Sequence, residues 1–238
     1  MLDHYSTENI LFLDIETAPQ VASFKELPEQ WKKLFDKKTE FKRKDEPVSE
    51  YYRSAGIYAE FGKIICICCG YFANTSGKKQ FRVKSFAGDD EKKLLMDFAA
   101  LLKKHFSTKK SNLCAHNGKE FDFPFIARRM LVHGLKLPPL LNIAGKKPWE
   151  VQFLDTMDLW RFGDYKNFTS LELLAATFDI PTPKDDIDGS MIYQVYWQEK
   201  NLERIIRYCR KDVVTIARLF QKFKGENMLS EKEIVMVD

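Results

Sequence analysis

The stretch ILFLDIET, residues 10–17, predicts a buried β-strand that ends in two carboxylates. Its first half consists of apolar strand-forming residues, and Pro19 closes the run. Side chains two positions apart on a strand share a face, so Asp14 and Glu16 are expected to point the same way, about 6–7 Å apart at the backbone. Both could then ligate one metal ion. For an isolated Asp-x-Glu pattern, however, the solvated end of a strand is the simpler interpretation.

A further carboxylate is expected at the start of a helix. Residues 112–116, NLCAH, predict a short buried strand, and Asn117-Gly118 is a turn pattern. Residues 121–134, FDFPFIARRMLVHG, then predict a helix that tolerates a proline in its first turn and ends at a glycine. Asp122 therefore lies at a helix N-terminus beside the sheet, where a plain capping role is an equally good explanation.

The third pattern lies on a long C-terminal helix. Apolar residues from Leu202 to Phe220 recur at 3.6-residue spacing, which predicts a helix over about residues 202–224. Tyr208 and Asp212 are four residues apart and share a face of that helix. A half-buried tyrosine beside an ordinary surface aspartate is the alternative. Clustered carboxylates need positive charge to hold them together, and a pair of divalent metal ions supplies it in phosphodiester cleavage.

The three patterns resemble, in the same order, the three sequence motifs of the DEDD 3′–5′ exonuclease superfamily. The chain is most similar to the proofreading domain of family-B DNA polymerases, in which Tyr-Cys is frequent before the last aspartate. Position 207 is arginine and position 208 is tyrosine, so the resemblance is to the tyrosine branch. Because 238 residues leave no room for a polymerase, the chain resembles the stand-alone, predicted family-B-like exonucleases. The resemblance covers about residues 8–224. The matching segments are DIET (14–17), NGKEFD (117–122) and YCRKD (208–212).

The resemblance implies a site of metal ligands and one tyrosine. Tyr208 would orient the attacking water as a neutral phenol. Two divalent ions, Mg²⁺ or Mn²⁺, are the implied cofactors, because these ions suit all-oxygen ligands. The implied metal ligands are Asp14, Glu16, Asp122 and Asp212.

The resemblance also implies contacts with the substrate. Lys184, in the segment KDDI (184–187), would neutralise the scissile phosphate, and the alternative is a lysine that is solvated or paired with neighbouring aspartates. Phe121 could equally be a core residue, and Ser170 could equally be a helix N-cap. The residues implied to hold the 3′-terminal nucleotides are Thr17, Asn117 and Phe121. Ser170 and Leu171 belong to a segment, 170–174, that is similar to one that touches single strands in the family.

The predicted elements match an α/β, ribonuclease-H-like fold with a mixed five-stranded sheet flanked by helices, as the resemblance implies. Three early strands with short links predict an antiparallel meander, and later strands that alternate with helices predict parallel additions. Residues 1–224 would form a single exonuclease domain with a basic and aromatic insertion at 24–60, while the tail 225–238 is either disordered or paired. Strands are expected at 10–16, 63–72, 79–86, 112–116 and 152–156, and helices at 89–105, 121–133, 158–162, 170–178, 189–199 and 202–224.

Composition supports one globular domain, since 45% of the residues are hydrophobic and 30% are charged. We expect a cytoplasmic protein, because no leader pattern or membrane-length apolar run is visible. The five cysteines lack a disulfide framework, so free thiols are expected. The spacing Cys-x-Cys-Cys is not the usual zinc pattern, and residues 63–72 are better explained as a buried strand. The alternative zinc ligands are Cys66, Cys68, Cys69, Cys114 and His116.

The net charge of +4 is too small to demonstrate nucleic-acid binding. Basic residues are nevertheless grouped at 32–44, 103–110 and 145–147, as either solvated faces or phosphate contacts. The predicted function is two-metal-ion hydrolysis of single-stranded DNA from its 3′ end to nucleoside 5′-monophosphates. An exoribonuclease with the same site and a catalytically silent nucleic-acid-binding module are the alternatives, and a repair or replication partner is left open.

Overall fold

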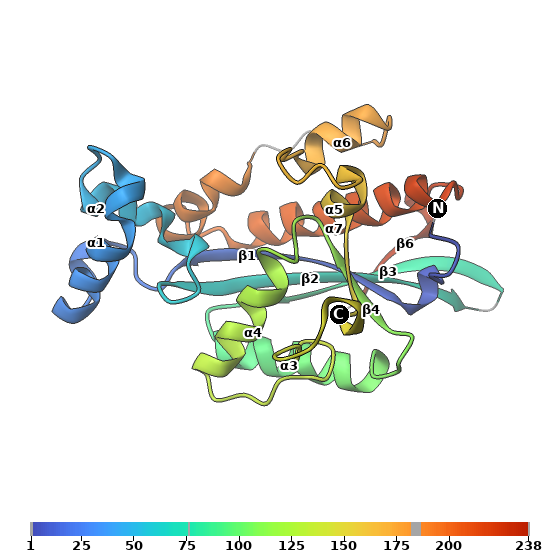
Figure 1. Cartoon of the computed structure of the whole chain (residues 1–238), viewed down its shortest axis with the longest axis horizontal. Helices are drawn as coiled ribbons and strands as arrows, with labels where there is room; N and C mark the ends of the chain where they lie inside the picture. Colours follow the sequence, from blue (N-terminus) through green and yellow to red (C-terminus); the bar gives the residue numbers. More distant parts are fainter. Residues whose placement is uncertain (1, 76, 182–186, 238) are drawn as a thin grey trace.

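β1 (Ile10–Pro19) lies in the interior of a six-stranded mixed sheet with the order β5-β4-β1-β2-β3-β6 (Figure 1). The structure is a computed structural model and describes residues 2–75, 77–181 and 187–237. Because β1 has a strand on each side and helices on both faces, its apolar run is buried. The other strands are β2 (Gly62–Thr75), β3 (Lys78–Ala87), β4 (Asn112–Ala115), β5 (Phe153–Asp155) and β6 (Ile234–Val237).

The strand directions confirm the predicted topology. β1, β2 and β3 pair antiparallel as a meander. β4 pairs parallel to β1, and β5 pairs parallel to β4, each after a helical crossover or a long connection. The carboxyl ends of β1, β4 and β5 therefore meet at one edge of the sheet.

The five predicted strands are all present, and the tail adds a sixth that the sequence did not predict. β6 pairs parallel to β3, from Phe81 opposite Ile234 to Lys84 opposite Val237. The buried Arg218 holds the start of the tail, because its guanidinium donates to the backbone oxygen of Leu229 at 3.1 Å. A four-residue edge strand carries too short a pattern to be recognised without its partner.

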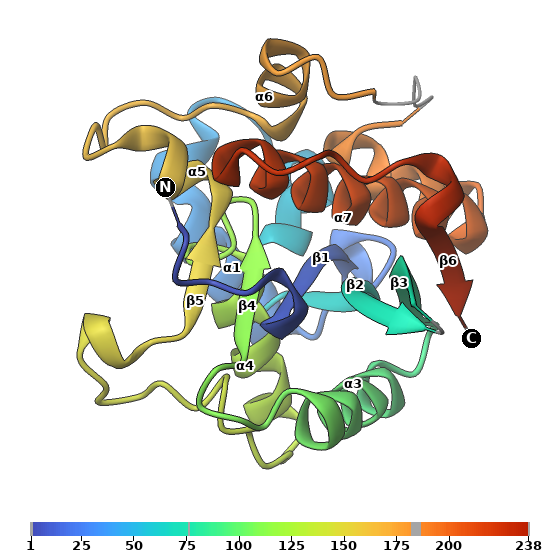
Figure 2. The same ribbon diagram turned by 90° about the vertical axis from the view of Figure 1, so that its right-hand side faces the viewer.

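Helices cover both faces of the sheet. Figure 2 shows α7 on one side of the strands and α3 and α4 on the other. α5 and α6 lie over α7, while α1 and α2 form a lobe at one end of the molecule (Figure 1). The helices are α1 (Glu29–Arg43), α2 (Val48–Tyr51), α3 (Glu91–His105), α4 (Asp122–Val132), α5 (Thr156–Arg161), α6 (Leu171–Thr177) and α7 (Leu202–Lys224).

α7 follows the predicted range because local signals define both of its ends. Asn201 caps the helix by accepting a hydrogen bond from Arg204 N–H at 3.1 Å, and Gly225 ends it with a φ of 70°. Gly70 of β2 lets α7 approach closely, since a Cβ there would lie 3.0 Å from Val213. The expected helix at 189–199 differs, because it is built from a 3₁₀ turn (Gly189–Met191) and a π turn (Gln194–Gln198).

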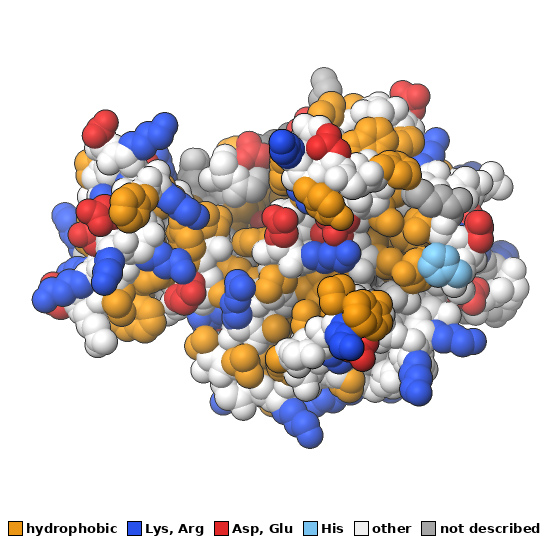
Figure 3. Space-filling model, viewed as in Figure 1, with side chains coloured by type: hydrophobic (Ala, Val, Ile, Leu, Met, Phe, Trp, Pro, Cys, Tyr) orange, Lys and Arg blue, Asp and Glu red, His pale blue; other side chains and the backbone are white. Residues whose placement is uncertain are grey.

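The insertion folds into a lobe with its own small core. Phe35 of α1 is 0% exposed and packs edge-on against Tyr52 and Phe61, with ring centroids 5.2 and 5.0 Å apart. Figure 3 shows Lys and Arg side chains distributed over the surface of this lobe. Arg43 is engaged within the lobe, because it pairs with Asp36. In the part of the chain that the structure describes, no helix combines the length and apolar character needed to cross a membrane.

A buried ion pair joins α3, α4 and β2. The Glu91 carboxylate accepts hydrogen bonds from Arg129 at 2.9 and 2.6 Å and from Ile64 N–H at 2.7 Å. His133 Nε2 lies 2.7 Å from the same carboxylate. Although burial acts to raise the pKa of Glu91, the Arg129 and His133 hydrogen bonds hold it below its usual value.

Glu91→Gln is expected to destabilise the fold by about 3–5 kcal/mol, because it leaves the buried Arg129 without a counter-charge. A carboxylate with a lowered pKa stabilises the fold above its unfolded pKa of about 4.3, and the effect is lost as the pH falls through the folded value. Urea unfolding at pH 7 and pH 4 measures both effects. The exposed Glu40→Gln is the control, and a Glu91→Gln stability equal to that of this control would contradict the assignment.

Candidate functional site

Three elements bring four carboxylates together. Asp14 and Glu16 alternate with Phe12 on the face of β1 where Phe12 contacts Phe220 of α7, with ring centroids 5.6 Å apart. Burial raises the pKa of Asp14 well above its ordinary value, and the charges of the other three carboxylates raise it further. Burial and the charge of Asp212 likewise raise the pKa of Glu16. This much mutual repulsion indicates a place built for positive charge.

Asp122 joins the N-terminus of α4 to β1. Its Oδ1 accepts a hydrogen bond from Ile15 N–H at 3.1 Å, across 107 residues of sequence. The N-cap of α4 is Phe121, so Asp122 is not the plain capping residue that was the alternative. Burial raises the pKa of Asp122 to about 7, although hydrogen bonds from its own N–H and from Ile15 N–H oppose the shift.

Tyr208 and Cys209 connect α7 to the carboxylates. The Tyr208 hydroxyl hydrogen-bonds to Asp212, one turn further along the helix. Burial raises the pKa of Tyr208 well above its ordinary value, and the nearby carboxylates raise it further, so the phenol is neutral. Cys209 Sγ donates to the backbone oxygen of Asp14 at 3.4 Å, which ties α7 to β1 at the site.

Asp155, which the sequence analysis did not single out, holds the turn that leads to Asp122. Its carboxylate accepts hydrogen bonds from Asn117 N–H at 2.9 Å, Lys119 N–H at 3.0 Å and Met157 N–H at 2.9 Å. Asn117 has a φ of 59°, a strained conformation that these bonds help to maintain. The only sequence signal for this role was an aspartate at the end of a predicted strand.

A cavity of about 870 Å³ lies beside the carboxylates, between β1, the insertion lobe and the segment after residue 187. Glu16 lines it from β1, and Arg53 and Tyr51 line it from the lobe. Figure 3 shows the surface hollowed between the lobe and the rest of the molecule. The lobe therefore completes the cavity, which the local sequence patterns did not reveal.

The residues predicted to bind substrate fall into two groups. Thr17 and Phe121 line the cavity beside Glu16. Asn117 lies in the turn before α4, with a buried Oδ1 that has no hydrogen-bond partner in the described ranges. Ser170 caps α6, where its hydroxyl accepts from Leu173 N–H at 3.2 Å, and Leu171 packs beside α7. Lys184 lies outside the described residues.

The alternative zinc ligands are spread over both faces of the sheet. Cys69 belongs to the core half under α3 and α4, while Cys66 and Cys68 face α7. His116 is engaged elsewhere, with Nδ1 2.9 Å from Thr156 Oγ1 and Nε2 2.9 Å from the backbone oxygen of Thr169. The interpretation of residues 63–72 as a buried strand is confirmed, and all five cysteines are free thiols.

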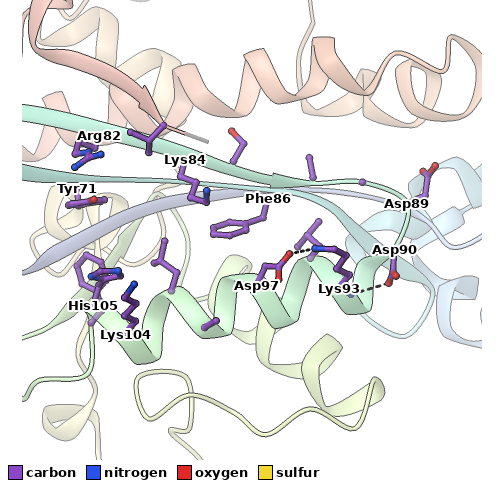
Figure 4. Close-up of a pocket in the computed structure, with 18 residues that line it drawn as sticks. Tyr71, Arg82, Lys84, Phe86, Asp89, Asp90, Lys93, Asp97, Lys104 and His105 are labelled. Atoms are coloured by element: carbon purple, nitrogen blue, oxygen red, sulfur yellow. Dashed lines mark hydrogen bonds and ion pairs between the residues drawn. The ribbon is translucent and has the colours of Figure 1, made fainter.

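A second cavity, of about 800 Å³, lies between β3 and α3 (Figure 4). Phe86 lies in its middle, with Arg82 toward one end and Asp89 toward the other (Figure 4). Asp97 in this cavity already pairs with Lys93 at 2.6 Å, as the dashed line in Figure 4 shows. The charge of Asp97 is thus already paired within this cavity.

The donor set of the carboxylate cluster fits hard divalent cations. Ligand atoms of Asp14, Glu16 and Cys209 all lie within 4.8 Å of one another. Asp14 Oδ2 is buried and accepts no hydrogen bond from any described residue, so it is free to bind a cation. Several carboxylate oxygens at one point are the ligands that Mg²⁺ and Mn²⁺ prefer.

The fold resembles those of solved nucleases and polymerases. The family B DNA polymerase of the archaeon Pyrobaculum calidifontis superposes with a TM-score of 0.54 and 14% identity, over 90% of this chain and 24% of the polymerase. The RNase domain of the yeast Pop2 protein superposes with a TM-score of 0.44 and 11% identity, over 98% of this chain and 83% of the Pop2 domain. Product-bound exonuclease I superposes with a TM-score of 0.39 and 13% identity, over 85% of this chain and 46% of the exonuclease. The chain thus spans about a quarter of the polymerase, and the likeness to this polymerase alone supports a ribonuclease-H-like fold.

No curated protein matches the sequence significantly. A family model described as "Predicted 3'-5' exonuclease related to the exonuclease domain of PolB" matches residues 57–235, more than half of the chain. The match includes Asp122, Tyr208 and Asp212, while Asp14 and Glu16 precede it and are brought to the matched part by the fold. The chain therefore belongs to this family of predicted 3′–5′ exonucleases related to the exonuclease domain of PolB.

Proposed function

We propose that the chain is a metal-dependent 3′–5′ exonuclease that releases nucleoside 5′-monophosphates from single-stranded DNA. The observation that carries this proposal is the convergence of four carboxylates and Tyr208 next to a cavity large enough for a nucleotide. Family membership supports a nuclease of this type. The polarity, the substrate and the use of two ions are the proposed parts.

The proposed ligands are held in place by the chain itself. Asp122 accepts a hydrogen bond from the Ile15 N–H, and Asp212 is carried by α7, where the Tyr208 hydroxyl donates to it. When bound, two divalent ions would make the attacking water more acidic and stabilise the leaving oxygen. The ions would be held by Asp14, Glu16, Asp122 and Asp212.

Tyr208 is proposed to position the attacking water rather than to remove its proton. Its raised pKa keeps the phenol neutral across the physiological range, so it donates one hydrogen bond and accepts others. Its hydroxyl lies beside Asp212, which is itself a proposed ligand. A water between these groups would therefore be oriented by Tyr208.

The cavity suits an unpaired nucleotide. Aromatic Phe121 and Tyr51 line its walls, and so does Arg53, whose side chain is 65% exposed and pairs with Glu46 at 3.0 Å. Aromatic rings stack on bases, and cationic groups contact phosphates, without a requirement for a particular base. A base paired in a duplex would have to be freed first, which costs stacking and pairing energy. Single-stranded ends are therefore the proposed substrate.

Degradation is expected to start at the 3′ end and to depend on added metal. A gel time course with 5′-labelled single-stranded DNA should show a ladder of shortening products with Mg²⁺ or Mn²⁺, and no products with EDTA. A 3′-labelled strand should release labelled mononucleotide at once, and a matched duplex should be cleaved more slowly.

RNA of the same sequence, and DNA with a 3′-phosphate, are the comparison substrates. Faster cleavage of RNA would favour the exoribonuclease alternative, in which contact with the 2′-hydroxyl selects the substrate. Binding without cleavage of any strand would favour the silent nucleic-acid-binding module. Loss of label from the 5′ end first would overturn the proposed polarity.

A further inference from the structure

Three buried thiols form a cluster directly behind the carboxylates. Their Sγ atoms all lie within 4.8 Å of one another, and the Cys66 and Cys68 sulfurs are 3.5 Å apart. Cys66 and Cys68 share one face of β2, and Cys209 approaches them from α7. Each of the three residues is 0% exposed. β2 and α7 thus bring three sulfur atoms close together.

The spacing of the sulfurs is compatible with a metal site. Thiolates bound to one small ion at about 2.3 Å lie about 4 Å from each other. The 3.5 Å separation of the Cys66 and Cys68 sulfurs is close to that value, and the Cys209 sulfur lies within 4.8 Å of both.

Two hydrogen bonds connect the guanidinium of Arg210 to the thiol cluster. Arg210 Nε donates to Ser85 Oγ at 2.7 Å, and Ser85 Oγ lies 3.2 Å from Cys68 Sγ. A guanidinium behind a ligand offsets the negative charge that thiolates bring into a core, and an outer partner of this kind orients the ligand.

Cys209 gives the cluster an entry route. Its sulfur belongs to the thiol cluster and also lies within 4.8 Å of ligand atoms of Asp14 and Glu16. Asp14 is only partly buried. A cation that arrives at the carboxylates can thus pass to the thiols through Cys209, without a separate channel.

We propose that Cys66, Cys68 and Cys209 bind one thiophilic d¹⁰ cation, of the class of Zn²⁺, Cd²⁺ and Cu⁺, at a site distinct from the hard-ion carboxylate site. Soft thiolate ligands select such ions over Mg²⁺ and Mn²⁺. Each metal–sulfur bond replaces an S–H bond, the proton passes to solvent, and no atom changes oxidation state. The site is independent of the proposed exonuclease activity, because it rests on the sulfur positions alone.

The test uses the full reduced chain, freed of metal and then given Mg²⁺ to compete for the carboxylates, and each addition is left to reach equilibrium because Mg²⁺ there slows entry past them. Cd²⁺ is titrated while the ultraviolet thiolate-to-cadmium charge-transfer band and the released protons are followed. One Cd²⁺ per chain is expected, with release of the protons that the free thiols hold, about two or three per ion, because the pKa of Cys68 is lowered while those of Cys66 and Cys209 are raised. X-ray absorption at the cadmium edge should show sulfur neighbours, and a shell of oxygen alone would overturn the proposal whatever the variants do.

Matched variants separate this cluster from the other buried thiols. Cys66→Ser, Cys68→Ser and Cys209→Ser should each weaken Cd²⁺ binding by at least about 100-fold, more than an outer partner costs. Cys69→Ser is the control, because Cys69 is a neighbour in β2, is equally buried and faces the other core half. Equal losses in the control, or unchanged binding in the three variants, would overturn the proposal. Where a serine variant fails to fold, the alanine variant at that position is used.

Discussion

Asp14→Asn is expected to abolish cleavage while the chain remains folded. Asp14 carries a buried carboxylate oxygen, Oδ2, with no hydrogen-bond partner in the described part of the chain, and the hydrogen bond of its side chain with Cys209 is not an ion pair. Removal of one preorganised electrostatic group commonly costs about 10²- to 10³-fold in rate, and loss of a carboxylate that would hold the metal should cost at least about 10³-fold. Single-turnover cleavage of a labelled oligonucleotide in saturating Mg²⁺ measures this loss.

The same variant should be more stable than the wild type when metal is absent. A carboxylate whose pKa is raised in the folded state stabilises the fold fully below its unfolded pKa of about 3.9, and this stability is lost as the pH rises through the folded value. Asp14 and Asp122 both have raised pKa values, that of Asp122 to about 7. Metal-free wild-type protein should therefore lose stability between about pH 4 and pH 7, and Asp14→Asn should lose less.

Thermal melts in EDTA at pH 5 and pH 8 test this difference. Glu203→Gln is the control, because Glu203 is an exposed carboxylate in the first turn of α7. Wild-type cleavage by Asp14→Asn would contradict its role as a ligand. A variant that melts below the wild type in EDTA would instead show that Asp14 has a structural partner.

Local patterns predicted most of the fold, because most of its strands and helices are determined by residues that lie close together in the sequence. The apolar run before Asp14 predicted β1, and the 3.6-residue spacing before and after Tyr208 predicted α7 with both ends correct. The antiparallel meander followed from the short links between strands. Where backbone geometry departs from regular helix, as in the π turn Gln194–Gln198, spacing alone could not show it.

The parts that the sequence did not predict depend on contacts between distant segments. Asp155 acts on a turn 36 to 38 residues earlier, and a lone aspartate at a strand end does not reveal its partners. Arg53 and Tyr51 reach the cavity only because the lobe folds back beside β1. β6 is a short edge strand whose pairing with β3 needs the whole sheet to be in place.

The four carboxylates are an intermediate case. Each motif could be found by its spacing, yet each had a plausible structural explanation when taken alone. Their order along the chain, rather than any one spacing, favoured a common site, and the structure brings them to one place. Lys184 stays a prediction, because its sequence context is weak and it lies outside the described residues.

Tyr208→Phe is expected to lower the maximal cleavage rate by about 10²- to 10⁴-fold, the usual range for a positioned acid–base group. The substitution keeps the half-buried ring and removes only the hydroxyl that hydrogen-bonds to Asp212. Because the ring packing is unchanged and Tyr208 is not a proposed ligand, the KM for DNA and the concentration of Mg²⁺ needed for half-maximal rate should stay close to the wild-type values. Steady-state and single-turnover rates over a range of Mg²⁺ concentrations measure the three quantities.

The control for this variant is Tyr71→Phe, which removes a hydroxyl from a half-buried tyrosine on the opposite face of the sheet. It should cleave at the wild-type rate, so a shared loss would indicate a general effect on the fold. A raised Mg²⁺ requirement in Tyr208→Phe would mean that the hydroxyl serves mainly to hold Asp212 in place. A full-rate Tyr208→Phe enzyme would refute the proposed positioning of water, since no other change in that variant could restore the lost hydrogen bond.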